Sequence, residues 1–195
     1  GIYVRENGNL VIVNSTVYGN NAGKGAGIAV YGTAAKPSKA VIVSCTIAGN
    51  ATVTAGSGAG LQQAAVGGAV EVYNTLISGN TTDGAADDVA WFKGASYKVA
   101  NSIIGNTVYN AEGGVVAGAA FDAATMLSPL GENGGTTKSC VLLGDANPAR
   151  QYGMSQSELR ILGESLDPAF DEAISSVDQT GASREGRTVV GAVVK

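Results

Sequence analysis

The chain has 195 residues, with 45% hydrophobic and 14% charged side chains and a formal net charge of −4. This length suits one domain with a sizeable core, and the apolar, β-branched content excludes a disordered chain. The small acidic net charge argues against nucleic acid as a partner. The lack of long apolar runs excludes a membrane-spanning helix. The absence of histidine excludes a Ser-His-Asp triad and a histidine-bound zinc.

A thirty-residue repeat organises the first half of the chain. Residues 14–20, with the sequence Asn-Ser-Thr-Val-Tyr-Gly-Asn, return in similar form at 44–50 and 74–80, and a copy at 101–106 is one residue shorter. A fixed period of this kind indicates stacked units that bury their apolar faces against one another. Because the chain begins inside such a unit without a signal peptide, we expect it to be the C-terminal part of a longer protein.

Each unit is predicted to contain three short strands, because β-branched residues alternate there between turns rich in glycine and asparagine. In chain order the predicted strands are residues 1–4, 9–14, 16–18, 27–30, 40–43, 46–48, 60–63, 69–72, 76–77, 88–91, 97–99 and 102–104. Side chains two residues apart share a face, so the strands supply three inward rows. These rows are Leu10, Ala40, Val70 and Tyr97; Ile12, Ile42, Val72 and Val99; and Val17, Ile47, Ile77 and Ile104.

The stacked rows predict an all-β fold, a right-handed parallel β-helix with three short strands and about 30 residues per coil. A two-sheet β-sandwich also explains many short strands, but it does not explain a fixed period with matched corners. We expect coils over residues 1–110, followed over residues 111–195 by the last coil or coils and a C-terminal cap of the same domain.

Two corners recur in every unit. Asparagine tolerates the left-handed backbone, and stacked asparagine side chains can bond to one another in a ladder, which we expect at the first corner. Glycine supplies a positive φ at the second corner, where it always precedes asparagine. The predicted structural residues are Asn14, Ser44, Asn74 and Asn101 at the first corner and Gly19, Gly49, Gly79 and Gly105 at the second.

Two short helices are predicted in the C-terminal part. Ser155 and Glu158 form a capping box before an apolar stretch, and Asp167 precedes Pro168 as a second N-cap with proline at the first helical position. We expect both helices to cover the open end of the stack, where unpaired strand edges need protection.

The chain has two cysteines, Cys45 and Cys140. Cys45 occupies the position that other units give to Ser15 and Thr75, which favours a small side chain stacked in the core. A disulfide between Cys45 and Cys140 is the alternative, and the sequence leaves the pairing open.

Several segments resemble bacterial surface proteins. Residues 1–21 (GIYVRENGNLVIVNSTVYGNN) are similar to the repeats of bacterial surface β-helix proteins of the polymorphic outer membrane protein and choice-of-anchor Q families, within the pectin-lyase-like fold group. The closing segments of the second family resemble, in the same order, residues 127–136 (LSPLGENGGT), 141–149 (VLLGDANPA), 178–184 (DQTGASR) and 190–192 (VGA). Residues 154–176 depart from the pattern, because the family usually runs straight on there.

The resemblance implies a bacterial protein that is secreted or associated with the outer membrane, and therefore extracellular or at the cell surface. It implies a non-catalytic, adhesin-like module without a cofactor, which binds a polysaccharide or a host-cell glycan. A polysaccharide lyase or glycoside hydrolase of pectin-lyase-like fold, or its accessory domain, is the first alternative, and a purely structural stalk is the second. The oligomeric state stays open.

Two groups of side chains are candidates for a ligand site. Trp91 and Tyr97 lie beside a variable loop of the fourth unit, and sugars stack on aromatic faces; the alternative is that such rings close the core. Asp83, Asp87 and Asp88 supply the carboxylates of a weak calcium site or of an acid pair, and the alternative is a loop followed by a strand start. We expect no catalytic residue, and the three Asp are the one weak candidate for a metal.

Overall fold

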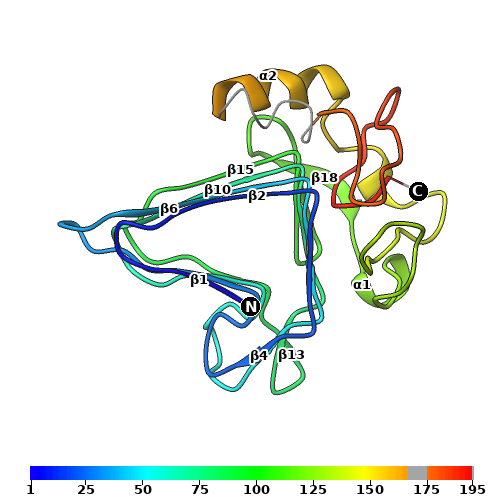
Figure 1. Cartoon of the computed structure of the whole chain (residues 1–195). Coiled ribbons are helices and arrows are strands. Elements are labelled where there is room, and N and C mark those ends of the chain that lie inside the picture. Colours follow the sequence, from blue (N-terminus) through cyan, green and yellow to red (C-terminus); the bar gives the residue numbers. More distant parts are fainter. Residues whose placement is uncertain (167–174, 195) are drawn as a thin grey trace.

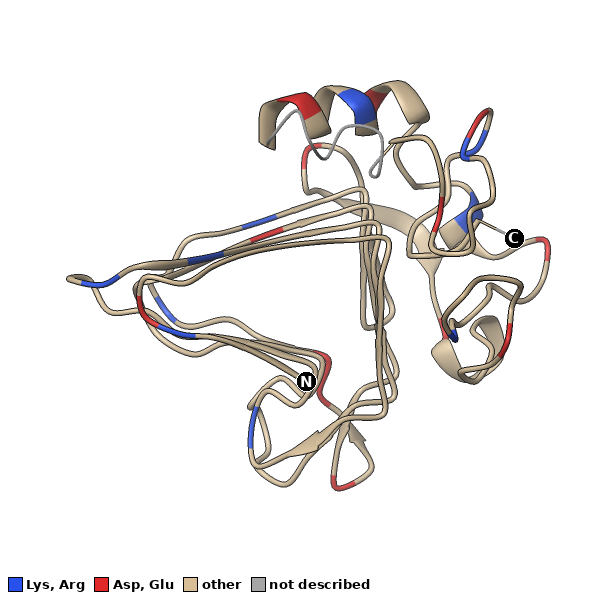
Figure 2. Ribbon diagram, in the orientation of Figure 1, with Lys and Arg blue, Asp and Glu red and all other residues tan. Residues whose placement is uncertain are grey.

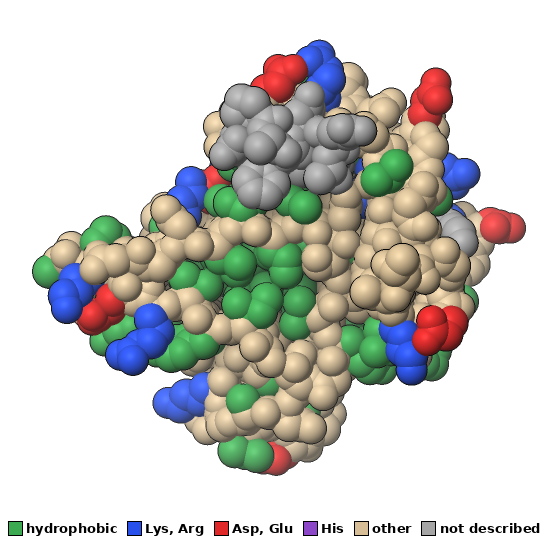
Figure 3. Space-filling view, viewed as in Figure 1, with side chains coloured by type: hydrophobic (Ala, Val, Ile, Leu, Met, Phe, Trp, Pro, Cys, Tyr) green, Lys and Arg blue, Asp and Glu red, His purple; other side chains and the backbone are tan. Residues whose placement is uncertain are grey.

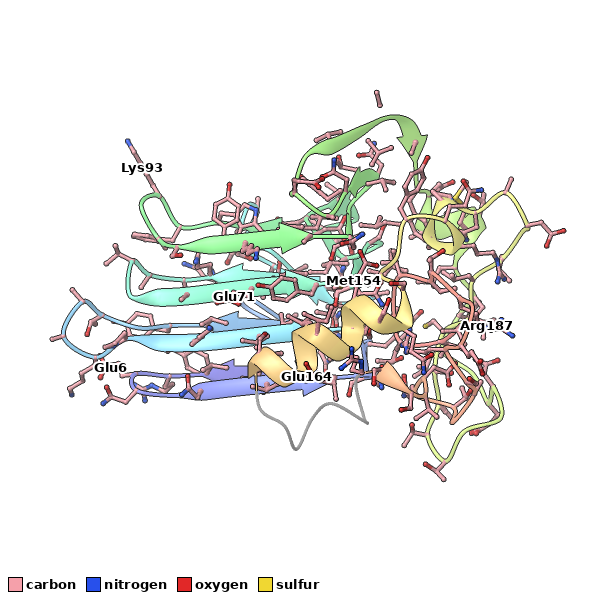
Figure 4. All side chains as sticks on the ribbon, turned by 90° about the horizontal axis from the view of Figure 1, so that it is seen from above. Glu6, Glu71, Lys93, Met154, Glu164 and Arg187 are labelled. Atoms are coloured by element: carbon pink, nitrogen blue, oxygen red, sulfur yellow. The ribbon has the colours of Figure 1, made fainter. Side chains whose placement is uncertain are left out.

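The computed structural model describes residues 1–166 and 175–194, and it shows a parallel β-solenoid of about three turns with some 30 residues per turn. Three sheets form the sides of a triangle in Figure 1, and a small fourth sheet lies at one corner. Viewed from the N-terminal end, the chain runs clockwise through these sheets as it recedes, so the coil is right-handed (Figures 1 and 4). The predicted fold is therefore confirmed.

The strands of successive turns pair in parallel. Sheet A contains β1 (Ile2–Val4), β5 (Ile28–Val30), β9 (Leu61–Gln63) and β14 (Val89–Ala90). Sheet B contains β2 (Asn9–Val13), β6 (Ser38–Val43), β10 (Gly68–Tyr73) and β15 (Tyr97–Ala100). Sheet C contains β3 (Thr16–Tyr18), β7 (Thr46–Ala48), β11 (Leu76–Ile77) and β16 (Ile103–Ile104), and it continues with β17 (Thr107–Tyr109) and β18 (Val115–Ala120). Sheet D, which the sequence did not predict, contains β4 (Asn21–Ala22), β8 (Ala51–Thr52), β12 (Thr81–Thr82) and β13 (Ala85–Ala86).

The predicted inward rows are in register. Ile42 lies between Ile12 and Val72 in the sheet B pairing, and Ile42 and Val72 are completely buried. The other two rows also pair residue for residue from coil to coil. The aliphatic column that results excludes the β-sandwich, because each strand of the coils pairs in parallel with its equivalent in the next coil, 26 to 33 residues away.

The first corner has the predicted backbone but not the predicted ladder. Asn14, Ser44, Asn74 and Asn101 all have φ between +45° and +51°. One rung forms there, from Asn74 Nδ2 to Ser44 Oγ at 2.9 Å. The side-chain amides at this corner also donate outward, to carbonyl groups of the C-terminal region. Asn14 donates to Val177 O, Asn74 to Val189 O and Asn101 to Tyr152 O. The C-terminal backbone thus takes the partners that a ladder would have used.

The ladder forms at the second corner instead. Asn20 donates its backbone and side-chain N–H groups to Asn50 Oδ1, and Asn50 donates in the same way to Asn80 Oδ1. Asn80 donates both groups to Asp88 Oδ1, each at 2.8 Å. The preceding residues Gly19, Gly49, Gly79 and Gly105 all have the predicted positive φ.

A second ladder runs through the position of Cys45. Ser15, Thr75 and Ser102 each donate a hydroxyl to the carbonyl two residues earlier, and the thiol of Cys45 makes the equivalent 3.2 Å contact with Val43 O. Cys45 and Cys140 are both buried and free, so the small-core-residue prediction is confirmed and the disulfide is not formed.

The parallel stack ends by reversal of the chain. Gly105 and Asn106, predicted as a fourth copy of the second corner, form a turn that sends β17 back antiparallel to β16, and β18 then pairs antiparallel with β17. In sheet D, a turn at Asp83 and Gly84 likewise places β13 antiparallel to β12. Gly105 keeps the predicted positive φ, whereas the asparagine ladder ends before Asn106, because Asn80 donates to Asp88 Oδ1.

The C-terminal region contains α1 (Ala123–Met126), the short 3-10 helix η1 (Pro148–Arg150) and α2 (Gln156–Leu166). The capping box before α2 is confirmed, because Ser155 N donates to Glu158 Oε2 at 2.7 Å and Glu158 N donates to Ser155 Oγ. The second predicted helix, at Asp167 and Pro168, lies outside the described residues. None of the helices in the described part of the chain is long and apolar enough to cross a membrane.

The region beyond residue 110 lies beside the solenoid rather than across its end (Figures 1 and 4). Leu159 of α2 is 1% exposed and packs on outward side chains of sheet B, including Val41, Val43 and Tyr73. A further cluster joins the outer face of sheet C to Phe121, Leu127 and their neighbours. The expectation that α2 covers the open end was wrong, because the part of the outward face of sheet B beneath α2 is apolar and takes its apolar side chains instead.

A buried arginine holds the C-terminal segment on the first coil. Arg184 is 2% exposed, and its Nη2 donates to Asn14 Oδ1 at 2.9 Å and to Gly191 O at 3.1 Å, while Nε donates to Val177 O. Burial lowers the pKa of Arg184 to about 10, and the negative charge of Asp178 opposes the shift. These contacts join residues about 170 positions apart.

Charge is divided unevenly between the two parts of the chain. Eleven of the 16 Asp and Glu follow residue 110, whereas the 12 Lys and Arg are shared equally between the two parts. Figure 2 shows the basic positions of the coils mainly around sheets A and B. This side of the molecule is therefore less acidic than the whole chain.

Candidate functional site

A groove runs along the outer face of sheet A, where that face meets the loops that carry sheet D. It has a volume of about 550 Å³, and its lining includes Tyr3, Asn21, Lys24, Ala29 and Gln62. A volume of this size is typical of sites for small organic ligands. The lining combines the exposed aromatic ring of Tyr3 with the ammonium group of Lys24 and the amides of Asn21 and Gln62.

The floor of the groove follows from the strand register. Tyr3, Ala29 and Gln62 are consecutive members of one outward row of sheet A. The short side chain of Ala29 is buried and lets the loop at Gly25 pack between the larger side chains of the two neighbouring coils. Tyr3 is 59% exposed and lines the groove, so its ring is available to a ligand there.

The wall of the groove depends on a glycine. Gly25 has φ +53°, and a Cβ built on it would lie 2.8 Å from both Ala29 Cβ and Gln62 Oε1. Only glycine allows the loop to approach the floor this closely. Lys24, the preceding residue, is thereby placed on the rim.

The groove has a positive character. The guanidinium carbon of Arg5 lies 6.0 Å from the centroid of the Tyr3 ring, within reach of a cation–π contact. None of the described residues that line the groove is Asp or Glu, and neither Arg5 nor Lys24 forms a salt bridge within residues 1–166 and 175–194. Hydroxyl or acidic groups of a ligand would meet donors here rather than carboxylates.

The predicted aromatic pair lies elsewhere, at the C-terminal end of the coils. The rings of Trp91 and Tyr97 stack with centroids 4.4 Å apart and planes 8° from parallel. Trp91 packs against the aliphatic column, while Tyr97 remains 53% exposed. The two rings cover the end of the aliphatic column after the last coil, so they close the core. The exposed ring of Tyr97 still remains available to a ligand.

The predicted acidic group does not form one cluster. Asp83 occupies the sheet D turn with φ +48°. Asp87 accepts hydrogen bonds from Ser57 N, Gly58 N and the Thr82 hydroxyl. No group of three or more His, Cys, Asp or Glu in the described part of the chain is arranged to hold a metal ion.

Asp88 serves as the last acceptor of the asparagine ladder. Burial is the main cause that raises its pKa, and the nearby negative charge of Asp87 adds to the effect, although the two hydrogen bonds from Asn80 act against it. Asp87 and Asp88 therefore connect sheet D to the coils through hydrogen bonds to backbone and side-chain groups.

Sequence reasoning did not single out Tyr3, Lys24 or Gln62. The alternation of side chains in the first strand of each unit indicates part of this site, since it places Tyr3, Ala29 and Gln62 outward in one row. It could not show that the loop at Gly25 folds back over this row, because contacts between a loop and a sheet face leave no period in the sequence.

No protein family, curated protein or solved structure matches the chain. The parallel solenoid is established by its own strand register.

Proposed function

We propose that this chain is a non-catalytic binding module of the bacterial cell surface and that the sheet A groove binds a glycan. The observation that carries the proposal is the sheet A groove, whose lining combines the exposed ring of Tyr3 with the amide of Gln62 and the ammonium group of Lys24. Sugar rings offer C–H faces that stack on aromatic rings, and hydroxyl groups that bond to amide and ammonium groups. The surface location rests on the resemblance of the repeats.

The lining chemistry favours binding over cleavage. Glycoside hydrolysis needs two carboxyl groups on either side of the scissile bond, and the groove lining contains none. Asp87 and Asp88 are engaged with Ser57, Gly58 and Asn80. A lyase or hydrolase would need a different surface of the molecule, and a purely structural stalk would bind no glycan at all.

The test is a glycan-array screen of the 195-residue chain, followed by titration calorimetry with the best ligands. Replacing Tyr3 by alanine removes the stacking ring, and replacing Lys24 or Gln62 removes a donor; each loss is worth about 1 kcal/mol, or roughly a fivefold to tenfold weaker Kd. Tyr97→Ala and Lys93→Ala are the matched controls, because Tyr97 is 53% exposed against 59% for Tyr3 but lies outside the groove.

The fluorescence of Trp91 distinguishes the two candidate glycan sites. Binding in the groove leaves Trp91 emission unchanged, whereas binding at the aromatic pair changes it, because Trp91 stacks directly on Tyr97. Affinity that is lost in Tyr97→Ala and kept in Tyr3→Ala would assign the glycan to the aromatic pair and refute the groove. The absence of any glycan ligand would favour the stalk.

A further inference from the structure

The corner where sheets A and B meet is the apex of the triangle on the left of Figure 1. Each of the four units turns there through a four-residue loop that a backbone hydrogen bond closes. The closing bonds run from Gly8 N to Arg5 O, Lys36 N to Thr33 O, Gly68 N to Ala65 O and Ala95 N to Phe92 O. The four turns, residues 5–8, 33–36, 65–68 and 92–95, follow one another along the solenoid, and we call them the A–B ridge.

The A–B ridge exposes apolar side chains. Val66 is 52% exposed in the third turn, Phe92 is 45% exposed in the fourth, and Tyr97 follows the fourth turn at 53%. Gly94 has φ +82°, and a Cβ built on it would have no atom within 4 Å, so the fourth turn stands clear of the coils. Figure 4 shows Lys93, the residue before Gly94, pointing away from the molecule. The fourth turn thus presents an aromatic ring and an ammonium group from adjacent residues.

Positive charge prevails on the ridge and on the outward face of sheet B beside it, and Figure 3 shows basic and hydrophobic side chains together at this corner. The charged residues there are Arg5, Glu6, Lys36, Lys39, Glu71, Lys93 and Lys98. Lys36 Nζ lies 3.4 Å from Glu6 Oε2, so the first acid is paired. Lys39 Nζ lies 2.6 Å from Glu71 Oε1, so the second is paired as well. Lys93 and Lys98 form no salt bridge within residues 1–166 and 175–194.

This combination of side chains matches an extended anionic surface. A convex ridge cannot surround a small molecule, but it can lie along a lipid bilayer. At a bilayer surface, aromatic rings settle at the level of the headgroups, and lysine side chains reach the phosphates. Cations near an anionic bilayer add an attraction that falls off within a Debye length, about 8 Å at physiological ionic strength. The ridge supplies both kinds of side chain on one projecting edge.

We propose that the A–B ridge is a peripheral contact surface for a bilayer that contains anionic lipids. Phe92 and Val66 enter the headgroup region, and Lys93 binds lipid phosphates. The neighbouring lysines add positive charge around these contacts, so the association is reversible and weakens when salt is added. Phe92, Val66 and Lys93 do not line the sheet A groove, so the contact does not depend on glycan binding.

Co-sedimentation with lipid vesicles tests the proposal. We expect the 195-residue chain to bind vesicles that contain equal amounts of phosphatidylcholine and phosphatidylglycerol. Vesicles of phosphatidylcholine alone should bind about tenfold more weakly, because the attraction between lysine and lipid phosphate is then lost. The emission of Trp91, which precedes Phe92 and is the only tryptophan in the chain, should change when the anionic vesicles are added.

Matched substitutions locate the contact. Lys93→Glu and Lys24→Glu change the net charge equally, but Lys24 lies on the rim of the sheet A groove. We expect Lys93→Glu to weaken binding to the anionic vesicles about tenfold and Lys24→Glu to leave it nearly unchanged. Phe92→Ser should weaken binding about fivefold. Val53→Ser should not, although Val53 is 73% exposed, because it lies in the sheet D loops.

Three results would overturn the proposal. The first is a chain that does not bind the anionic vesicles. The second is an equal loss of binding in Lys93→Glu and Lys24→Glu, which would indicate attraction by the overall charge alone. The third is binding of soluble polygalacturonate that displaces the vesicles and persists in Phe92→Ser, which would assign the ridge to an acidic polysaccharide. All four substituted side chains are exposed, and circular dichroism checks that each variant folds.

Discussion

Replacing Asn50 with alanine removes the middle rung of the asparagine ladder. Asn50 is completely buried, and its Nδ2 donates to Val17 O, Ala48 O and Asn80 Oδ1 at 3.1, 3.1 and 2.8 Å. Its Oδ1 accepts from the backbone N and the side-chain Nδ2 of Asn20. One side chain thus connects three consecutive coils.

The cost follows from the groups left behind. Each buried polar group that loses its partner costs about 1–3 kcal/mol, and Asn50→Ala affects several of them in a site where the coils leave no room to rearrange. We expect the free energy of unfolding to fall by about 3–5 kcal/mol, near the upper limit for single substitutions. Asn20→Ala should cost only about 1 kcal/mol, because Asn20 lies in the partly exposed first layer, where water can replace the lost bonds.

Urea denaturation of the wild-type chain and the two variants, followed by circular dichroism, measures the difference. The asparagine side chain is the same in both substitutions, so Asn20→Ala controls for the intrinsic effect of the replacement. If Asn50→Ala and Asn20→Ala lose the same stability within about 1 kcal/mol, which exceeds the usual uncertainty of such comparisons, burial of the ladder is not what stabilises the corner.

Three further outcomes are expected. Asp88→Asn keeps the ladder acceptor and removes a partly buried charge, so unfolding in urea should show equal stability or a gain of up to about 1 kcal/mol; a clear loss would contradict the assigned role. Partial burial alone would raise the pKa of Glu71, but hydrogen bonds from Lys39 and Tyr73 lower this pKa below 4.5 overall. The ionised Glu71 therefore stabilises the folded state above pH 4.5, and this contribution is lost as the pH falls through the pKa of Glu71 in the folded protein. Glu71→Gln should make the free energy of unfolding depend less on pH in the acid range. Burial raises the pKa of the Cys45 thiol to about 12, so it should resist alkylation in the native protein at neutral pH, and Cys45→Ser should change stability by less than about 1 kcal/mol because serine occupies the equivalent ladder position at Ser15.

The corners show how far local sequence reaches. Both contain asparagine at a thirty-residue period, and the left-handed backbone at Asn14, Asn74 and Asn101 was predictable from the residue type alone. The position of the ladder was not, because it depends on what lies beside each corner. At Asn74 the C-terminal backbone offers Val189 O as a partner, whereas at Asn50 the side-chain partners all belong to the coils.

The candidate site shows the same division. The outward row of Tyr3, Ala29 and Gln62 follows from strand alternation, but the groove exists because the loop at Gly25 approaches that row. The predicted pair Trp91 and Tyr97 was correctly placed near the end of the coils, and only the structure showed that the two rings stack on each other over the core.

The sequence by itself determined the solenoid, its register and its inward rows, because repetition every thirty residues forces equivalent side chains onto neighbouring layers. Tertiary structure alone decided where the C-terminal region lies, which carboxylates become ladder acceptors and where the stack stops. The physical reason is that these features depend on contacts between segments as far apart as Asn14 and Arg184. Such contacts leave no repeating pattern in the amino-acid sequence.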